Sequence, residues 1–172
     1  MPHAIEEGPG TRGRSKDGAL RRSQAAGILT GGVVAGTLDI TYACVFWALK
    51  SGVPPRRIFQ SVAAGLLGPA SFEGGVATAA LGLLLHFFIA TTMSLVYFVA
   101  AGRFPVLLRR AFLCGTIYGL LLYAVMNYIV VPLSAASAGP RDPLWIGLSV
   151  LVHMFLIGVP IAVIIRSRHG AE

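Results

Sequence analysis

Four long apolar runs constrain the fold of this chain more than any other feature of its sequence. Each run exceeds the ~20 residues with which an α-helix crosses ~30 Å of hydrocarbon. Inside a bilayer the backbone has to satisfy its own hydrogen bonds, and a helix does this within one segment. The runs are Ala25–Leu49, Val76–Ala100, Ala111–Leu133 and Leu144–Ile165. We therefore predict an all-α, integral membrane four-helix bundle over residues 24–166.

The composition supports this prediction. Hydrophobic side chains make up 55% of the 172 residues and charged ones 12%, about half the ~25% of a typical soluble domain. The mean hydropathy is +0.74, which is too apolar for a water-soluble core. The net charge of +7 resembles that of a nucleic-acid binder, but the basic residues flank the apolar runs, as in proteins of anionic bilayers. We exclude a soluble domain, a disordered chain and a partner nucleic acid.

The segments outside the four runs are a basic tail at each end and one structured connector. Residues 1–23 are polar, Gly-rich and basic, so we expect a disordered cytoplasmic tail, with a second tail at residues 167–172. The connector between the first two runs carries one apolar helical stripe in Ile58–Gly68. It is too short to span, and we predict a short helix, about residues 56–68, that lies in the outer interface.

The distribution of Lys and Arg predicts the orientation in the membrane. With the N-terminus inside, ten basic residues fall on the cytoplasmic side and four on the outer side, namely Lys50, Arg56, Arg57 and Arg141. Cytoplasmic loops carry the excess of basic residues in membrane proteins. We therefore expect a bacterial inner-membrane protein with both termini in the cytoplasm. Trp47 and Trp145 fall at the outer ends of the first and fourth runs, where an aromatic belt belongs.

Small residues line one face of each predicted span. Close backbone approach at Gly and Ala replaces the hydrophobic effect as the force that joins helices in lipid. The glycines that we expect at such contacts are Gly32, Gly36, Gly82, Gly115 and Gly119. They would pack the helices within the bundle, or alternatively form a seam between two copies of the chain.

Each predicted span also contributes one polar residue to its small-residue face. These residues are Asp39, His86, Asn127 and His153. Because small faces pack inward, we expect all four to face the bundle interior. At 1.5 Å per residue, Asp39, His86 and His153 lie roughly 14–15 Å from the outer ends of their spans, and Asn127 roughly 9 Å. The first three therefore share one layer and are predicted to form an interior cluster.

Three interpretations of this intramembrane polar cluster compete. It is a hydrogen-bonded clasp that fixes helix register, or a proton or cation relay with Asp39 as the carrier and the histidines as switchable partners. The third is a metal ion or b-type haem with His86 and His153 as ligands, although no spacing signature strengthens it.

Motifs of soluble enzymes are absent from the sequence. There is no Walker loop, H-E-x-x-H pair, G-x-S-x-G elbow or C-x-x-C pair. Glu73 and Asp142, the acids nearest the outer surface, are far apart in sequence. We expect a non-enzyme without a resident cofactor: an accessory or interaction subunit that contacts lipid and either other membrane subunits or its own copy. A proton-linked carrier or channel is the first alternative, and a bis-histidine haem electron carrier the second.

Several stretches resemble a family of small four-span bacterial inner-membrane proteins. They are residues 55–68, Gly74-Gly75, 79–82, His86-Phe87, Tyr123–Pro132 and His153–Pro160. The resemblance covers most of residues 25–165. It implies the four-span fold and the inner-membrane location, and it implies no activity.

Overall fold

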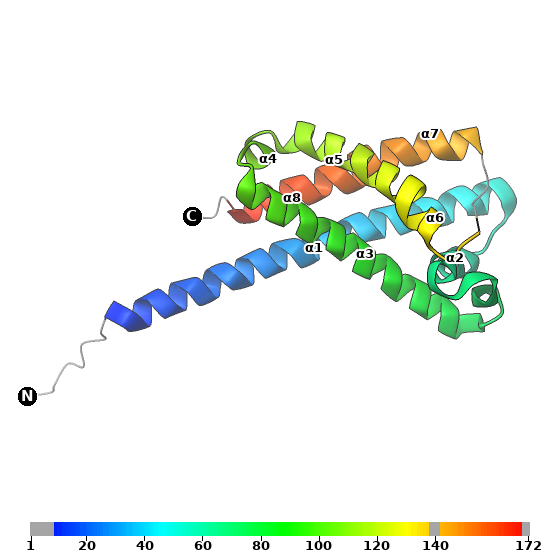
Figure 1. The fold of residues 1–172 in the computed structure, drawn as a ribbon, viewed down its shortest axis with the longest axis horizontal. Helices are drawn as coiled ribbons and strands as arrows, with labels where there is room; N and C mark the ends of the chain where they lie inside the picture. Colours follow the sequence, from blue (N-terminus) through cyan, green and yellow to red (C-terminus); the bar gives the residue numbers. More distant parts are fainter. Residues whose placement is uncertain (1–8, 138–141, 170–172) are drawn as a thin grey trace, which may run out of the picture.

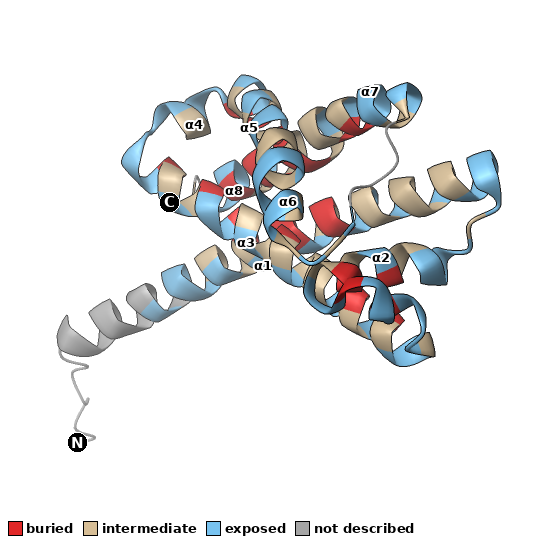
Figure 2. Ribbon diagram, turned by 45° about the vertical axis from the view of Figure 1, so that its right-hand side comes forward, coloured by how far each residue is buried: buried red, intermediate tan, exposed pale blue. Residues whose placement is uncertain are grey.

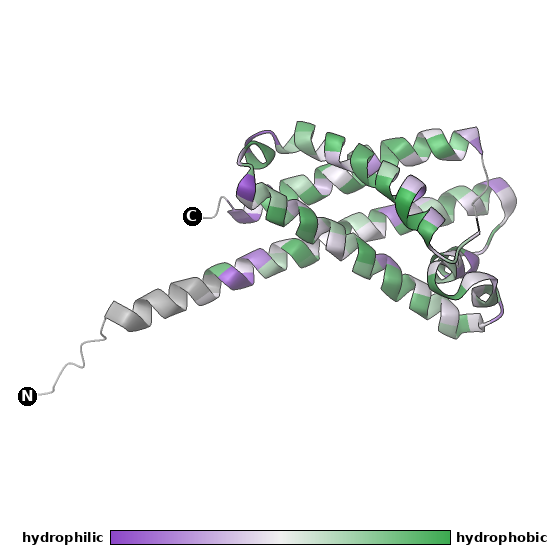
Figure 3. Ribbon diagram, in the orientation of Figure 1, coloured by the Kyte–Doolittle hydropathy of each residue, from purple (hydrophilic) through white to green (hydrophobic). Residues whose placement is uncertain are grey.

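The computed structural model of the chain describes residues 9–137 and 142–169, which form helices and no strands. Four of the helical segments are long and apolar enough to cross a membrane (Figure 1). They are Leu20–Ser51, Gly75–Arg103, Ala111–Leu133 and Pro143–His169. The predicted all-α, four-helix membrane architecture is confirmed. Figure 3 shows hydrophobic residues along the bundled helices and hydrophilic segments gathered toward the ends of the bundle.

The first helix is longer than the sequence predicts. Helix α1 runs over Pro9–Ser51 and protrudes far beyond the other helices (Figure 1). The expected disordered tail at residues 1–23 is therefore helical from Pro9 onward, and residues 1–8 lie outside the described part. Helix formation is costly to nucleate and cheap to extend, so a membrane span can propagate into a polar flank. At the other end α8, Val159–His169, continues into the segment expected to be the second tail.

The connector between the first two spans folds as predicted into a short helix. Helix α2 covers Pro55–Leu67 and is followed by a 3-10 segment, η1, at Gly68–Phe72. Pro54 and Pro55 begin α2, and Gly68 ends it with a φ of 61°, a left-handed conformation that suits glycine. Helix α2 packs against α3, Gly75–Arg103.

The helices pack around small and aromatic side chains. Helix α1 contacts α3 and α8, and α5, Ala111–Val125, contacts α8. A four-residue helix, α4, Val106–Arg109, precedes α5. Tyr97 is buried near the end of α3, and the Tyr118 hydroxyl joins α5 to α3 by donating to the Met93 carbonyl at 2.7 Å. Figure 2 shows the buried residues where the helices cross and exposed residues on their outer surfaces.

Two of the spans contain a widened, π-helical turn. The third span continues from α5 through η2, Met126–Val130, into α6, Val131–Leu133. The fourth runs from α7, Pro143–Val152, through η3, His153–Gly158, into α8. In each case a proline, Pro132 or Pro160, follows within two residues. A proline ring lacks the N–H and clashes with the carbonyl four residues earlier, so the turn before it widens.

Candidate functional site: an intramembrane cavity

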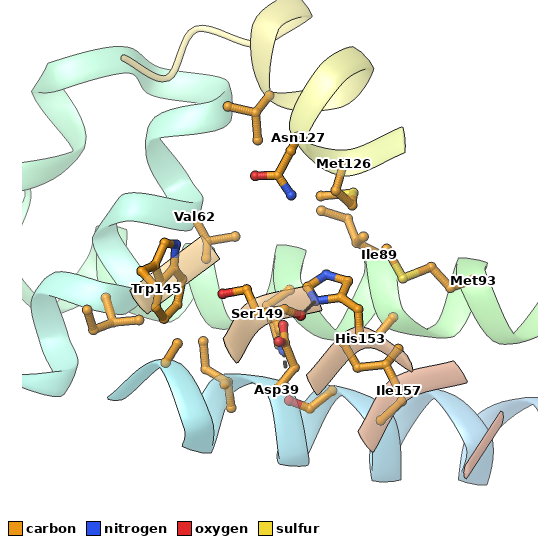
Figure 4. A pocket seen from close by; sticks show the side chains of 18 residues that line it. Asp39, Val62, Ile89, Met93, Met126, Asn127, Trp145, Ser149, His153 and Ile157 are labelled. Carbon is orange, nitrogen blue, oxygen red and sulfur yellow. Dashed lines mark hydrogen bonds between the residues drawn. The ribbon is translucent and has the colours of Figure 1, made fainter. Parts of the chain in front are cut away.

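A cavity of about 220 Å³ lies between the spans and is lined in part by Ile58 and Val62 of α2 (Figure 4). All four polar residues singled out in the sequence line it, together with Ser149. The other lining residues are apolar or aromatic, or glycine: Ala35, Gly36, Ile40, Ala43, Ile58, Val62, Ile89, Ala90, Met93, Met126, Val131, Trp145 and Ile157. The cavity is thus an apolar chamber with a few convergent polar groups, the usual composition of a small-molecule site.

The walls of the cavity come in part from α3 and the third span, which both reach α2. Helix α3 packs against α2, and just after the third span the backbone N–H of Ala135 donates to the Gly65 carbonyl at 3.0 Å. Ile89 on α3 and Met126 on η2 line the cavity between them. The second π-helical turn, η3, supplies His153 and Ile157. Such turns are rare and frequently occur at functional sites.

The two histidines are each held by a backbone carbonyl. His86 Nε2 lies 2.8 Å from the Gly36 carbonyl oxygen, and His153 Nδ1 lies 2.8 Å from that of Ser149. A carbonyl oxygen can only accept, so these ring nitrogens carry the proton and donate. When the rings are neutral, His86 Nδ1 and His153 Nε2 therefore keep their lone pairs. Each ring can accept a further proton there without breaking the bond that orients it.

Among the residues that the structure describes, Asp39 is the only acidic one that lines the cavity. Its side chain is half-buried, and no hydrogen bond to its carboxylate is found from any described residue. Within residues 9–137 and 142–169, no Lys or Arg lines it. In Figure 4 the side chains of Asp39, Ser149 and His153 are drawn around the same cavity. A charged carboxylate inside a membrane is unfavourable in free energy unless a cation pairs with it or a proton neutralises it. Asp39 is therefore a candidate to bind one of the two.

Asn127 differs from the expectation that all four polar residues face the interior. Its side chain is exposed, and Nδ2 donates to the Tyr123 carbonyl at 3.0 Å. Asn127, on η2, therefore lines the cavity at its exposed rim. Among the described residues, no hydrogen bond joins any two of the four predicted residues. The structure gathers them around one cavity and does not tie them into a direct clasp.

The five glycines predicted to pack helices all lie at contacts within the chain. A Cβ on Gly32 would lie 2.5 Å from the Thr91 Cα, and one on Gly36 would lie 2.9 Å from the Phe87 ring. Gly82 faces the backbone of Phe59 on α2. Gly115 and Gly119 face η3, and a Cβ on Gly119 would lie 2.6 Å from the carbonyl carbon of His153. Glycine is thus what allows the helices that form the cavity to approach so closely.

Sequence reasoning missed a group of aromatic and charged side chains that joins the end of α1 to the start of α7. Trp145 stacks on Tyr42 with ring centroids 5.2 Å apart and lies 5.3 Å from Trp47. Lys50 at the end of α1 forms an ion pair with Asp142, which caps α7. The hydrogen bond from Lys50, followed by that from the backbone N–H of Trp145, lowers the pKa of the Asp142 carboxyl. Lys50 and Asp142 carry opposite charges at the ends of two spans, and this pattern could have predicted the ion pair.

A second feature that sequence reasoning missed is the buried Gln60 of α2. Its Nε2 donates to the Gly75 carbonyl at 3.0 Å and lies 3.3 Å from Thr78 Oγ1. Thr78 in turn donates to the Ser71 carbonyl at 2.6 Å. This polar group fixes α2 and η1 against the start of α3, and with them the wall of the cavity. In the sequence, Gln60 is a lone polar residue next to the apolar stripe of α2, and this position could have indicated a buried hydrogen bond.

Within the described part of the chain, no group of three His, Cys, Asp or Glu side chains is arranged to hold a metal ion. The cavity instead provides one carboxylate and two proton-accepting imidazoles. The chain matches no family model, and neither a curated protein nor a solved structure is significantly similar to it.

Proposed function

We propose that this multi-pass membrane protein is a small proton-linked carrier that exchanges protons for a small cation. The observation that carries the proposal is the chemistry of the cavity. Asp39 lacks a hydrogen-bonding partner among the described residues, and each of the two histidines has one ring nitrogen that its bond to a backbone carbonyl leaves free. Intramembrane ionisable groups of this kind mark ion and proton pathways.

In the proposed mechanism Asp39 holds either a proton or the cation, because one carboxylate in an apolar chamber cannot stay charged and unpaired. His86 and His153 relay the displaced proton out of the cavity, since an imidazole can accept a proton on its free nitrogen and give it up again to water. The backbone bonds of both rings persist in either state, so the rings change charge without leaving the site. The volume of about 220 Å³ is below the ~300–1,000 Å³ of drug-sized sites, so it favours a small cation.

The test is cation uptake into liposomes that contain the purified protein and an internal pH dye. A pH gradient is imposed, and Na⁺, K⁺ and tetramethylammonium are supplied in separate experiments. We expect one of them to enter as protons leave, and Asp39→Asn to abolish both movements. Glu73→Gln, which neutralises an exposed acid outside the cavity, is the matched control and should transport normally. A wild-type protein that moves neither protons nor any of these cations would contradict the proposal.

A second candidate is the accessory subunit of a membrane complex, and the protruding half of α1 favours it. A helix that extends beyond its own bundle (Figure 1) offers a surface for another protein. Gentle purification from native membranes tests this role. A stoichiometric partner that is lost when residues 9–19 are deleted would support it, and a protein that purifies alone with and without that segment would argue against it.

We place the protein in a bacterial inner membrane with both termini in the cytoplasm, on the basis of the distribution of its basic residues. Haem or metal ligation by His86 and His153 stays a prediction. An absorbance spectrum of the purified protein tests it, because a bis-histidine haem gives an intense Soret band.

A further inference from the structure

A second hollow lies on the outside of the bundle, between α2 and α3. It has a volume of about 340 Å³ and is lined by Arg56, Phe59, Val76, Ala79, Ala80 and Leu83. Five of these six residues are apolar, and the sixth carries a positive charge. None of them lines the central cavity, so the groove is a separate feature.

The packing of α2 on α3 explains the shape of this groove. The helices meet closely at Gly82, where an added Cβ would lie 2.7 Å from the Phe59 carbonyl carbon. Beside this contact the α3 side chains are the small Ala79 and Ala80, which leave a trough between the two backbones. Val76 is 75% exposed, so the trough is open along its apolar side.

The charge in the groove is available for a ligand. Arg56 is exposed, and no hydrogen bond or ion pair to it is found within the described residues. The neighbouring Arg57 differs, because its Nη1 donates to the Phe72 carbonyl at 3.3 Å and its guanidinium lies 5.4 Å from the Phe72 ring centroid. Of this basic pair, Arg57 holds η1 in place, whereas Arg56 faces the groove.

The surroundings limit what can occupy the groove. It flanks the start of a candidate membrane span, next to the connector between the first two spans, and in a bilayer the exposed apolar surface of a span faces lipid. A guanidinium binds phosphate oxygens through two parallel hydrogen bonds, which a neutral apolar molecule cannot supply. The molecule that combines an apolar chain with an accessible anion in this position is a phospholipid.

We propose that the groove between α2 and α3 binds one anionic phospholipid, with its phosphate on Arg56 and an acyl chain along Ala79, Ala80 and Leu83. The bound lipid holds α2 against α3 and so supports the wall of the central cavity, to which α2 contributes Ile58 and Val62. The lipid site does not require that the central cavity carry ions.

Native mass spectrometry of the full-length protein tests the proposal. The protein is released from nanodiscs that contain equal amounts of phosphatidylglycerol and phosphatidylcholine, and the retained lipid is identified. We expect one retained phosphatidylglycerol per chain. Arg56→Gln should lower the preference for phosphatidylglycerol about fivefold, the effect of one interfacial basic residue. Arg103→Gln removes an exposed arginine at the far end of α3 and should leave the preference unchanged.

A second variant separates the loss of the site from the loss of the fold. Ala80→Phe fills the trough and keeps Arg56, and it should abolish lipid retention while helicity and thermal stability in detergent stay near wild type. Equal retention of the two lipids by the wild type, or an unchanged preference in Arg56→Gln, would overturn the proposal. A wild-type dimer that Ala80→Phe dissociates would also overturn it, because a second copy would then cover the groove.

Discussion

Replacing Gly119 with alanine should disturb both the stability of the protein and its cavity. Gly119 lies on α5 directly against η3, where the π-helical turn brings the backbone of His153 toward the facing helix. A Cβ there would overlap the His153 carbonyl oxygen and lie 2.6 Å from both the His153 carbonyl carbon and the Met154 Cα. These are backbone atoms, so a side-chain rotation cannot relieve the overlap. The fourth span has to move, and His153 moves with it.

The size of the effect follows from the contact. Overpacking a tight interior typically costs about 1–3 kcal/mol, and the backbone clash favours the upper part of this range. Alanine also recovers up to about 1 kcal/mol of helix propensity relative to glycine. We therefore expect a net destabilisation of about 1–2 kcal/mol, which is roughly a 5- to 30-fold change in the unfolding equilibrium constant.

The free energy of unfolding can be measured by titrating the protein from mild detergent micelles into a denaturing detergent. Gly102→Ala and Gly147→Ala are matched controls, because both glycines lie in helices. Apart from their chain neighbours and their own helix backbone, no atom of the described residues lies within 4 Å of an added Cβ. Both controls should be as stable as the wild type or slightly more stable. If Gly119→Ala behaves like the controls, the close packing of α5 on η3 and the cause assigned to it are wrong.

Three further outcomes are expected. Gln60→Leu removes the bond to the Gly75 carbonyl and should lower the free energy of unfolding by about 1–2 kcal/mol; an unchanged thermal midpoint would argue against this. The Lys50 hydrogen bond lowers the pKa of Asp142, so this carboxylate stabilises the fold above its unfolded-state pKa of about 3.8, and the contribution is lost as the pH falls through the lower folded-state pKa. Asp142→Asn should remove that pH dependence from unfolding titrations. A reporter that is active only outside the cytoplasm should stay silent when fused after Glu172. Reporter activity would show that the predicted orientation is wrong.

The fold was predictable because the bilayer restricts the choices. An apolar run long enough to cross it has to be a helix, so four runs gave four spans with boundaries close to those observed. The short helix α2 followed from its proline start, glycine stop and one apolar stripe. The helical start of α1 at Pro9 did not follow, because the flank of a span carries no apolar period that would mark it.

The sequence predicted which ionisable residues line the cavity, but it did not predict their hydrogen bonds. Asp39, His86 and His153 could be grouped because each lies on a small-residue face at a similar depth. Their hydrogen bonds to backbone carbonyls depend on ring orientation, which residue spacing does not specify. The rim position of Asn127 depends on the π-helical turn before Pro132, and 3.6-residue periodicity cannot represent a turn that is one residue longer.

The central claim is that a proton and a cation compete for Asp39 in the cavity. The most direct measurement is the pH of a weakly buffered detergent solution of the purified protein. The pH is recorded while the cation identified by the uptake assay is added. We expect the wild type to release protons as the cation binds, and Asp39→Asn to release none. Cation binding by the wild type without proton release, or equal release from Asp39→Asn, would contradict proton-linked exchange at this site.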